Sequence, residues 1–332
     1  MMYGKGLVFF APFANKIWWN LQMEMIINLA LLVVGFALLV KGADWFVDGS
    51  SSIAARLGIP QLVIGLTIVA MGTSAPEAAV SITAASRGSA DITIGNILGS
   101  NIMNILIILG LAAFLTCIHV GKSTVFREIP FMILISVLLL VLGMDGSVTF
   151  MDGVILWGAF LVYLGYLFRM TKNNDAEEET SINTERPLWK SVLWTIIGLA
   201  LIVLGSDVAV DAATSIAHIM GMSERLIGLT IVALGTSLPE LFTSVTAAKK
   251  GNADIAIGNI VGSNIFNILF VVGTSALVTP IPFASAFLTD GVIAIAAAML
   301  LLICCLHHYS LARKSGIAML ASYATYFTVM LM

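Results

Sequence analysis

Charged residues are scarce in this chain of 332 residues: 11% are Asp, Glu, Lys or Arg, whereas 59% are hydrophobic. A soluble domain of this size carries about a quarter charged residues. The 16 lysines and arginines form no cluster suited to nucleic acid, and the net charge of −3 is small, so no nucleic-acid partner is expected. The composition predicts an all-α protein with several spans in a lipid bilayer.

Cysteine is nearly absent as well. Cys117, Cys304 and Cys305 lie in or at the ends of apolar segments and show no metal-ligand spacing. They therefore form neither a disulfide framework nor a zinc site, and we interpret them as packing residues. No cofactor is expected.

Apolar runs of spanning length follow one another along most of the chain, separated by short breaks with Gly, Pro or charged residues. Residues 1–22 form a lead-in too short to span. An acidic linker, 171–188, separates two halves, 23–170 and 189–332, with five spans each. The ten transmembrane helices are expected near residues 24–47, 60–86, 90–116, 127–146, 150–170, 190–217, 223–249, 253–278, 285–306 and 314–332.

The two halves contain the same long motif. Residues 64–110 align with 227–273 without a gap, and roughly two positions in three are identical. The offset that carries Glu77 onto Glu240 is 163 residues. Because an odd number of spans separates the copies, the copies cross the bilayer in opposite directions. Such an inverted repeat is typical of secondary transporters that bind their substrate at the midplane.

Basic residues indicate the orientation. Most Lys and Arg fall in or beside loops that follow odd-numbered spans, and only Arg87 and Arg225 fall in loops that follow even-numbered ones. The positive-inside rule then places the 171–188 linker in the cytoplasm and both termini outside, in the cell (inner) membrane.

Each copy of the motif sets a Thr-Ser-x-Pro-Glu segment inside an apolar run. Pro76 and Pro239 have no backbone N–H, so each leaves the carbonyl four residues earlier, that of Gly72 or Gly235, without its helical donor. Freed backbone oxygens are tolerated at membrane depth only where they are buried in protein or line a cavity. We therefore expect broken helices at a midplane site.

The same segments contain Glu77 and Glu240. A carboxylate at the bilayer centre costs roughly 2.5 to 3.5 kcal/mol on insertion scales, and no Lys or Arg lies at that depth in either repeat to compensate it. A functional role is favoured for this reason. Thr73 and Thr236 precede the glutamates by four residues and share their helix face.

The following span of each half adds more oxygen atoms. Ser100 and Asn104, like Ser263 and Asn267, are four residues apart. A set of oxygen donors without His or Cys suits Ca²⁺ or Na⁺. A site that holds one divalent ion or several monovalent ions, but not both at once, meets the requirement of antiport.

Other polar residues favour structural roles. Lys41, Asp44 and Asp48 are expected to form local pairs at the cytoplasmic end of the first span. Asp91 and Asp254 begin the third and eighth spans, where an acid caps a helix N-terminus favourably.

GTSAPE at 72–77 with GSNIMN at 99–104, and GTSLPE at 235–240 with GSNIFN at 262–267, closely resemble the two alpha repeats of the cation/calcium exchanger superfamily. Within it the chain is similar to the prokaryotic sodium/calcium exchangers, from about Met25 onward. The resemblance implies that spans two, three, seven and eight form a core, against which spans one and six slide to alternate access.

The resemblance also implies the role of each site residue. Several family members carry an aspartate where this chain has Asn267, so its central site has an amide on both sides and one fewer ionisable group, which leaves the coupling stoichiometry open. The implied set is Glu77 and Glu240 as principal Ca²⁺ ligands, the carbonyls of Thr73 and Thr236 completing that site, Ser74, Ser100, Ser237 and Ser263 with the carbonyls of Ala70 and Ala233 at flanking Na⁺ sites, and Asn104 at the centre.

The expected function is therefore exchange of Na⁺ for Ca²⁺ by alternating access, with no obligate protein partner. A Ca²⁺/H⁺ antiporter on the same scaffold is the nearest alternative. A membrane-embedded aspartyl protease is disfavoured because its acids are aspartates in other motifs. A passive channel is disfavoured because this chain carries its own two-fold pseudo-symmetry, whereas selective channels usually assemble around an axis from several subunits.

Overall fold

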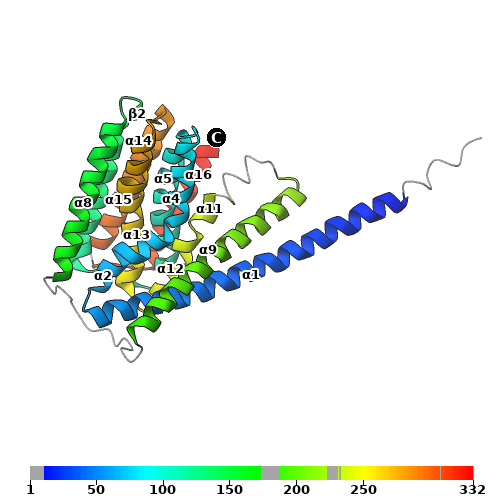
Figure 1. The fold of residues 1–332 in the computed structure, drawn as a ribbon, viewed down its shortest axis with the longest axis horizontal. Helices are drawn as coiled ribbons and strands as arrows, with labels where there is room; N and C mark the ends of the chain where they lie inside the picture. Colours follow the sequence, from blue (N-terminus) through cyan, green and yellow to red (C-terminus); the bar gives the residue numbers. More distant parts are fainter. Residues whose placement is uncertain (1–10, 173–186, 223–230, 232, 307, 332) are drawn as a thin grey trace, which may run out of the picture.

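A computed structural model describes residues 11–172, 187–222, 231, 233–306 and 308–331, and these residues are almost entirely helical (Figure 1). With η denoting a π-helix, the helices are α1 (Ala11–Leu57), α2 (Gln61–Ile64), η1 (Gly65–Val69), α3 (Ala70–Thr73), α4 (Ala75–Ser86), α5 (Asp91–Met103), η2 (Asn104–Leu109), α6 (Gly110–Leu115), η3 (Thr124–Glu128), α7 (Ile129–Leu142), α8 (Phe150–Lys172), α9 (Leu188–Ile219), α11 (Ala233–Thr236), α12 (Leu238–Lys249), α13 (Ala253–Phe266), η5 (Asn267–Val272), α14 (Gly273–Val278), α15 (Ser285–Leu306) and α16 (Arg313–Leu331).

Several of these helices are long and apolar enough to cross a membrane. Among the described residues seven qualify, and the bent pair Gln61–Thr73 and Ala75–Ser86 brings the number to eight. The prediction of an all-α membrane protein is confirmed. Part of the span expected at 223–249 lies outside the described residues, and α16 occupies the tenth expected segment.

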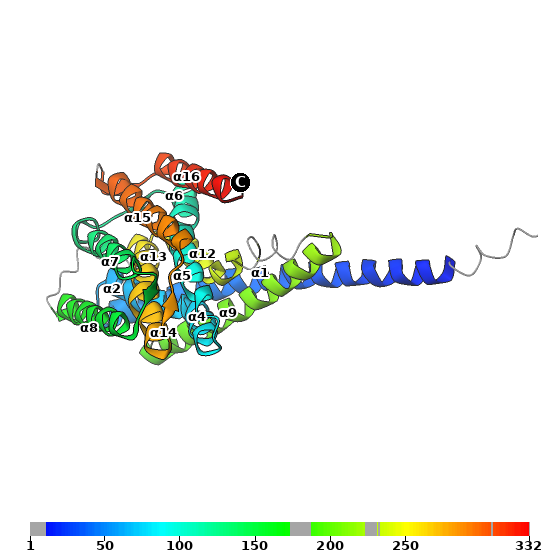
Figure 2. The ribbon, with the colours of Figure 1, turned by 90° about the horizontal axis from the view of Figure 1, so that it is seen from above.

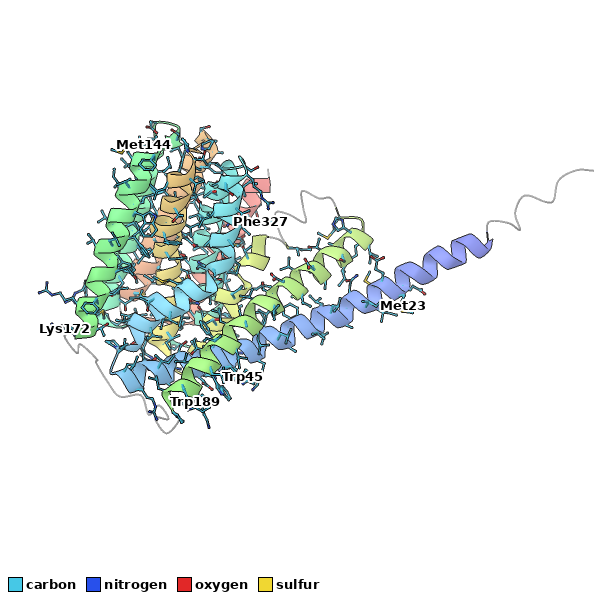
Figure 3. All side chains as sticks on the ribbon, viewed as in Figure 1. Met23, Trp45, Met144, Lys172, Trp189 and Phe327 are labelled. Atoms are coloured by element: carbon cyan, nitrogen blue, oxygen red, sulfur yellow. The ribbon has the colours of Figure 1, made fainter. Side chains whose placement is uncertain are left out.

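Two helical segments form the core. In the most apolar stretch of Ala253–Val278, 94% of the residues are buried, and in that of Ile92–Leu115, 78% are buried, whereas the share is at most 33% in the other five spans. The bundle's outer surface is apolar: Val162 and Phe168 on α8 are 72% and 75% exposed, as suits a surface facing lipid. Figure 3 shows such side chains along α8, with Met144 and Lys172 at opposite ends of the bundle.

Helices α1 and α9 form an antiparallel pair that lies obliquely against this bundle, and α1 continues well beyond it (Figures 1 and 2). The helix begins at Ala11, so the described part of the expected lead-in continues directly into the first span. Glycines bring the two backbones together: a Cβ added to Gly42 would lie 2.8 Å from Gly198 O, and one added to Gly205 would lie 2.8 Å from Gly35 O. Small residues at such contacts are the usual means of close helix packing in membranes.

Short strands connect the two halves. Strand β1 (Ile118–His119) pairs with β4 (Ser310–Leu311), and β2 (Ser147–Val148) pairs with β3 (Ile281–Pro282), both antiparallel. The 163-residue offset of the repeat carries β1 onto β3 and β2 onto β4. The pairing brings together the loops after the third and ninth expected spans, and separately those after the fourth and eighth. Loops that follow odd-numbered expected spans thus lie together, and so do loops that follow even-numbered ones. This grouping is what a chain that crosses the bilayer back and forth requires.

Candidate ion-binding site

The first helix break lies at Ser74. The helices on either side of it differ in direction by 51°. Ser74 has φ −82° and ψ 7°, outside the helical region, and Pro76 occupies the first turn of α4, where its missing N–H costs no bond. Ser237 has nearly the same backbone, φ −94° and ψ 4°, and Pro239 follows it in the same way. The predicted breaks are therefore present in both repeats.

The two breaks meet each other. The Ser74 hydroxyl of the first repeat donates to Oε1 of Glu240 in the second, at 2.7 Å. The Ser237 hydroxyl donates to Oε1 of Glu77 at 3.4 Å. These contacts are related by the 163-residue offset, so each repeat supplies a hydroxyl to the other's carboxylate. Both glutamates are buried, with exposures of 1% and 0%, and no ion pair among the described residues includes either of them.

Two asparagines are arranged with the same symmetry. Asn104 and Asn267 are buried, and each is the first residue of a π-helix, η2 or η5. A π-helical turn inside an α-helix often marks a functional site. The Asn104 amide donates to Asn264 Oδ1 at 2.9 Å, and the Asn267 amide donates to Asn101 Oδ1 at 3.1 Å.

Four buried oxygens of these glutamates and asparagines accept no hydrogen bond from any residue that the structure describes. They form two symmetry-related pairs: Oε2 of Glu77 and Glu240, and Oδ1 of Asn104 and Asn267. A buried oxygen without a donor costs about 1 to 3 kcal/mol, and more when it is charged. Four such acceptors, with no cationic side chain paired to them, form an environment that a bound cation would satisfy.

One pair of the expected flanking residues is brought together by the structure. Ser263 Oγ lies 3.5 Å from Ala70 O, so two members of one implied Na⁺ site are adjacent. Ser100 is buried in α5, and Ala233 begins α11. Thr73 is fully buried, and its hydroxyl lies 2.9 Å from Asn259 Oδ1 and 3.1 Å from Val69 O, whereas the Thr236 hydroxyl has no partner among the described residues.

A family model described as "Sodium/calcium exchanger protein" matches the chain twice, at residues 27–169 and 190–332, so that each half is matched separately. The chain belongs to the sodium/calcium exchanger family. The resemblance carried by the GTSxPE and GSNIxN motifs is thereby confirmed. The family consists of exchangers rather than enzymes, and this member is a multi-pass membrane antiporter of Ca²⁺ and a second cation.

Relatives of this exchanger cover most of its length. It is 42% identical to the putative antiporter CaxA of Alkalimonas amylolytica, over 83% of this chain and 88% of that protein. It is 32% identical to the sodium/calcium exchanger MaX1 of Methanosarcina acetivorans, over 92% of this chain and 98% of that one. A structure of the sodium-calcium exchanger NCX_Mj soaked with Na⁺ and Sr²⁺ matches with a TM-score of 0.80 and 33% identity, covering 92% of this chain and 99% of that chain.

Three asparagines of the exchanger's site were not singled out from the sequence. Asn101 and Asn264 bond the central asparagines, and Asn259 lies 2.9 Å from the Thr73 hydroxyl while donating to Ser244 Oγ at 2.8 Å. Asn101 and Asn264 precede the central asparagines by three residues in both copies, which puts them near the same helix face. That repeated spacing is the signal that could have identified them.

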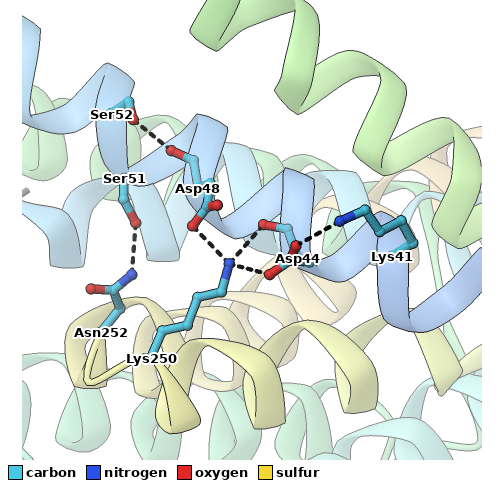
Figure 4. A network of polar contacts seen from close by, with 7 residues as sticks. All are labelled: Lys41, Asp44, Asp48, Ser51, Ser52, Lys250 and Asn252. Carbon is cyan, nitrogen blue, oxygen red and sulfur yellow. Dashed lines mark hydrogen bonds and ion pairs between the residues drawn. The ribbon is translucent and has the colours of Figure 1, made fainter. Parts of the chain in front are cut away.

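Ion pairs also join α1 to the end of α12, the helix whose first turn contains Glu240. Lys250 Nζ lies 2.5 Å from Asp44 Oδ1 and 2.7 Å from Asp48 Oδ1 (Figure 4). The expected local pair is present too, since Lys41 Nζ lies 3.2 Å from Asp44 Oδ2. Spacing along α1 predicted that local pair, but it could not predict Lys250, which comes from the other repeat.

Replacing Lys250 with Ala is expected to lower the free energy of unfolding by about 1 kcal/mol, because Asp44 and Asp48 lose a cation they share in partly exposed positions. The measurement is the thermal unfolding midpoint in detergent at low salt. Arg87→Ala is the matched control: Arg87 is the pseudo-symmetric counterpart of Lys250, and no ion pair among the described residues includes it. Equal losses in both variants would contradict the prediction.

Proposed function

We propose that this exchanger moves Ca²⁺ across the membrane against Na⁺, with both ions competing for one site between the two helix breaks. The observation that carries this proposal is the set of four buried oxygens without donors, on Glu77, Glu240, Asn104 and Asn267. All four are hard donors of the kind that Ca²⁺ and Na⁺ prefer. They come in equal numbers from the two repeats.

Charge explains why the two ions would exclude each other. Glu77 and Glu240 lie in a buried site, no ion pair among the described residues includes them, and when ionised they carry two negative charges together. One Ca²⁺ neutralises both carboxylates, and so do two Na⁺ ions, but the two loads together would leave an excess of buried positive charge. Serine hydroxyls and the Ala70 carbonyl beside Ser263 supply the neutral oxygens that Na⁺ accepts. The residues proposed as ligands are the eleven of the set that the resemblance implied, together with Asn267.

The proposed topology has ten transmembrane helices in two inverted halves, with residues 23–170 and 189–332 as the repeats and 171–188 as a cytoplasmic linker. Both termini then face the outside of the cell (inner) membrane. The repeat offset carries β1 onto β3 and β2 onto β4, yet β1 pairs with β4 and β2 pairs with β3. Equivalent strands of the two halves therefore lie in different pairs, which supports opposite orientations of the halves. Helices α1 and α9 contact each other more extensively than either contacts the bundle. This pair is the element proposed to slide during alternating access.

The deciding experiment concerns the coupling ion. Purified protein in vesicles loaded with Na⁺ and diluted into Na⁺-free buffer is expected to accumulate ⁴⁵Ca²⁺, because outward Na⁺ movement drives Ca²⁺ inward through the shared site. Matched vesicles with an imposed pH gradient and no Na⁺ serve as the control. Uptake that follows only the pH gradient would contradict Na⁺ coupling and favour the Ca²⁺/H⁺ alternative on the same scaffold.

A further inference from the structure

Four buried asparagines, two of which are proposed ligands, form a chain of hydrogen bonds between the repeats. Asn101 and Asn104 come from α5 and η2, and Asn264 and Asn267 come from α13 and η5. All four have exposures of 3% or less. An asparagine amide has one end that donates and one that accepts, so the direction of each side chain decides which end its neighbour meets.

Backbone carbonyls fix the direction of this chain of amides. The Asn264 side-chain amide donates to the backbone oxygen of Asn101 at 3.1 Å. A carbonyl oxygen can only accept, so this end of Asn264 must be Nδ2 and its opposite end must be Oδ1. That Oδ1 accepts the Asn104 amide at 2.9 Å, which forces Asn104 to use its own Nδ2 there. The remaining atom, Asn104 Oδ1, is the buried oxygen without a donor.

The second repeat has the same arrangement. The Asn101 side-chain amide donates to the backbone oxygen of Asn264 at 3.4 Å, and its Oδ1 accepts the Asn267 amide at 3.1 Å. Asn267 Oδ1 is then left without a donor, as Asn104 Oδ1 is. Both central asparagines therefore direct an oxygen, and not an NH₂ group, away from the chain of amides.

From this geometry we infer that Asn101 and Asn264 are positioning residues that keep the central site able to bind a cation, by fixing the amide orientation of Asn267 and Asn104. The inference rests on the proposed function. If either central amide were reversed, it would offer N–H groups, whose partial positive charge repels a cation. The backbone carbonyls of Asn101 and Asn264 thus keep the oxygen ends of both central asparagines available to a cation, and they do so without adding charge.

Substitution of Asn104 by aspartate provides the discriminating test, because both ends of a carboxylate are oxygen acceptors. Whichever way the aspartate turns, it offers an oxygen to the ion. Ca²⁺ binding by this variant should therefore not depend on Asn264 as it does with the native asparagine. Ca²⁺ affinity is to be measured by isothermal titration calorimetry on the purified full-length exchanger. The variants are Asn264→Ala, Asn104→Asp and the pair combined, which together form a double-mutant cycle.

Asn264→Ala is expected to weaken Ca²⁺ binding about tenfold with asparagine at position 104. With aspartate there it should not weaken binding, because an aspartate oxygen facing Asn264 Oδ1 makes no hydrogen bond that the substitution could remove. Asn96→Ala, which removes an amide bonded only to Ser81 within the first repeat, is the control and should act equally in both backgrounds. The unfolding midpoint of each variant reports any loss of folding separately.

Equal weakening by Asn264→Ala in both backgrounds would overturn the inference and leave Asn264 as a packing residue. A wild type that binds Na⁺ but not Ca²⁺ would contradict the proposed function, and the same cycle measured with Na⁺ would then decide the role of the amides. A wild type that binds neither ion would overturn both.

Discussion

Replacing Glu77 or Glu240 with Gln is expected to lower Na⁺-driven Ca²⁺ uptake at least about a hundredfold, which corresponds to roughly 2.8 kcal/mol of lost ion binding. Gln keeps the size of the side chain but removes half of the site's negative charge. It also places an NH₂ group where a buried oxygen now has no donor. The measurement is the initial rate of ⁴⁵Ca²⁺ uptake into Na⁺-loaded vesicles at equal protein content.

The matched control is Glu128→Gln. Glu128 is another buried carboxylate whose Oε2 also has no donor among the described residues, but it lies in η3, and its Oε1 accepts hydrogen bonds from Tyr166 and Ser123 and not from a serine at a helix break. Uptake by this variant is expected to stay within about twofold of wild type, since hydroxyl donors can bond a Gln oxygen as well. Wild-type rates in either Glu77→Gln or Glu240→Gln would refute the proposed ligands.

The breaks and their carboxylates could be predicted because their signals are local. A proline within an apolar run breaks a helix whatever surrounds it, and a membrane-embedded glutamate without a nearby Lys or Arg requires a functional explanation. Both signals occur twice at one offset, which excludes coincidence. The structure has the breaks at Ser74 and Ser237, where the prolines place them, and joins each serine to the other repeat's glutamate.

Contacts between distant helices could not be predicted in this way. Lys250 meets Asp44 and Asp48 because α12 ends beside the C-terminal part of α1. Hydrophobic periodicity contains no information on how two helices are shifted relative to each other. The π-turns that begin at Asn104 and Asn267 were missed for a related reason. The residues of η2 and η5, NILIIL and NILFVV, resemble those of the neighbouring apolar helices and contain no local signal for a widened turn.

The second large effect is expected on stability, from a substitution at Gly198. Replacing Gly198 with Ala is expected to cost at least about 2 kcal/mol of unfolding free energy, near the upper part of the range for overpacked cores. The added Cβ would lie 2.5 Å from Phe46 N and 2.8 Å from Gly42 O. These are backbone atoms, which cannot rotate away as a flexible side chain can, so α1 and α9 would have to separate. The thermal unfolding midpoint in detergent measures the loss.

Gly165→Ala in α8 is the matched control, because no described atom lies within 4 Å of the Cβ that it would add. Alanine favours a helix over glycine by roughly 0.5 to 1 kcal/mol, so this variant should be neutral or slightly stabilised. If α1 and α9 slide as one body, Gly198→Ala should also slow Ca²⁺ uptake in the fraction that remains folded, whereas Gly165→Ala should not. Equal unfolding midpoints for the two variants would show that the glycine contact between α1 and α9 is looser than the distances indicate.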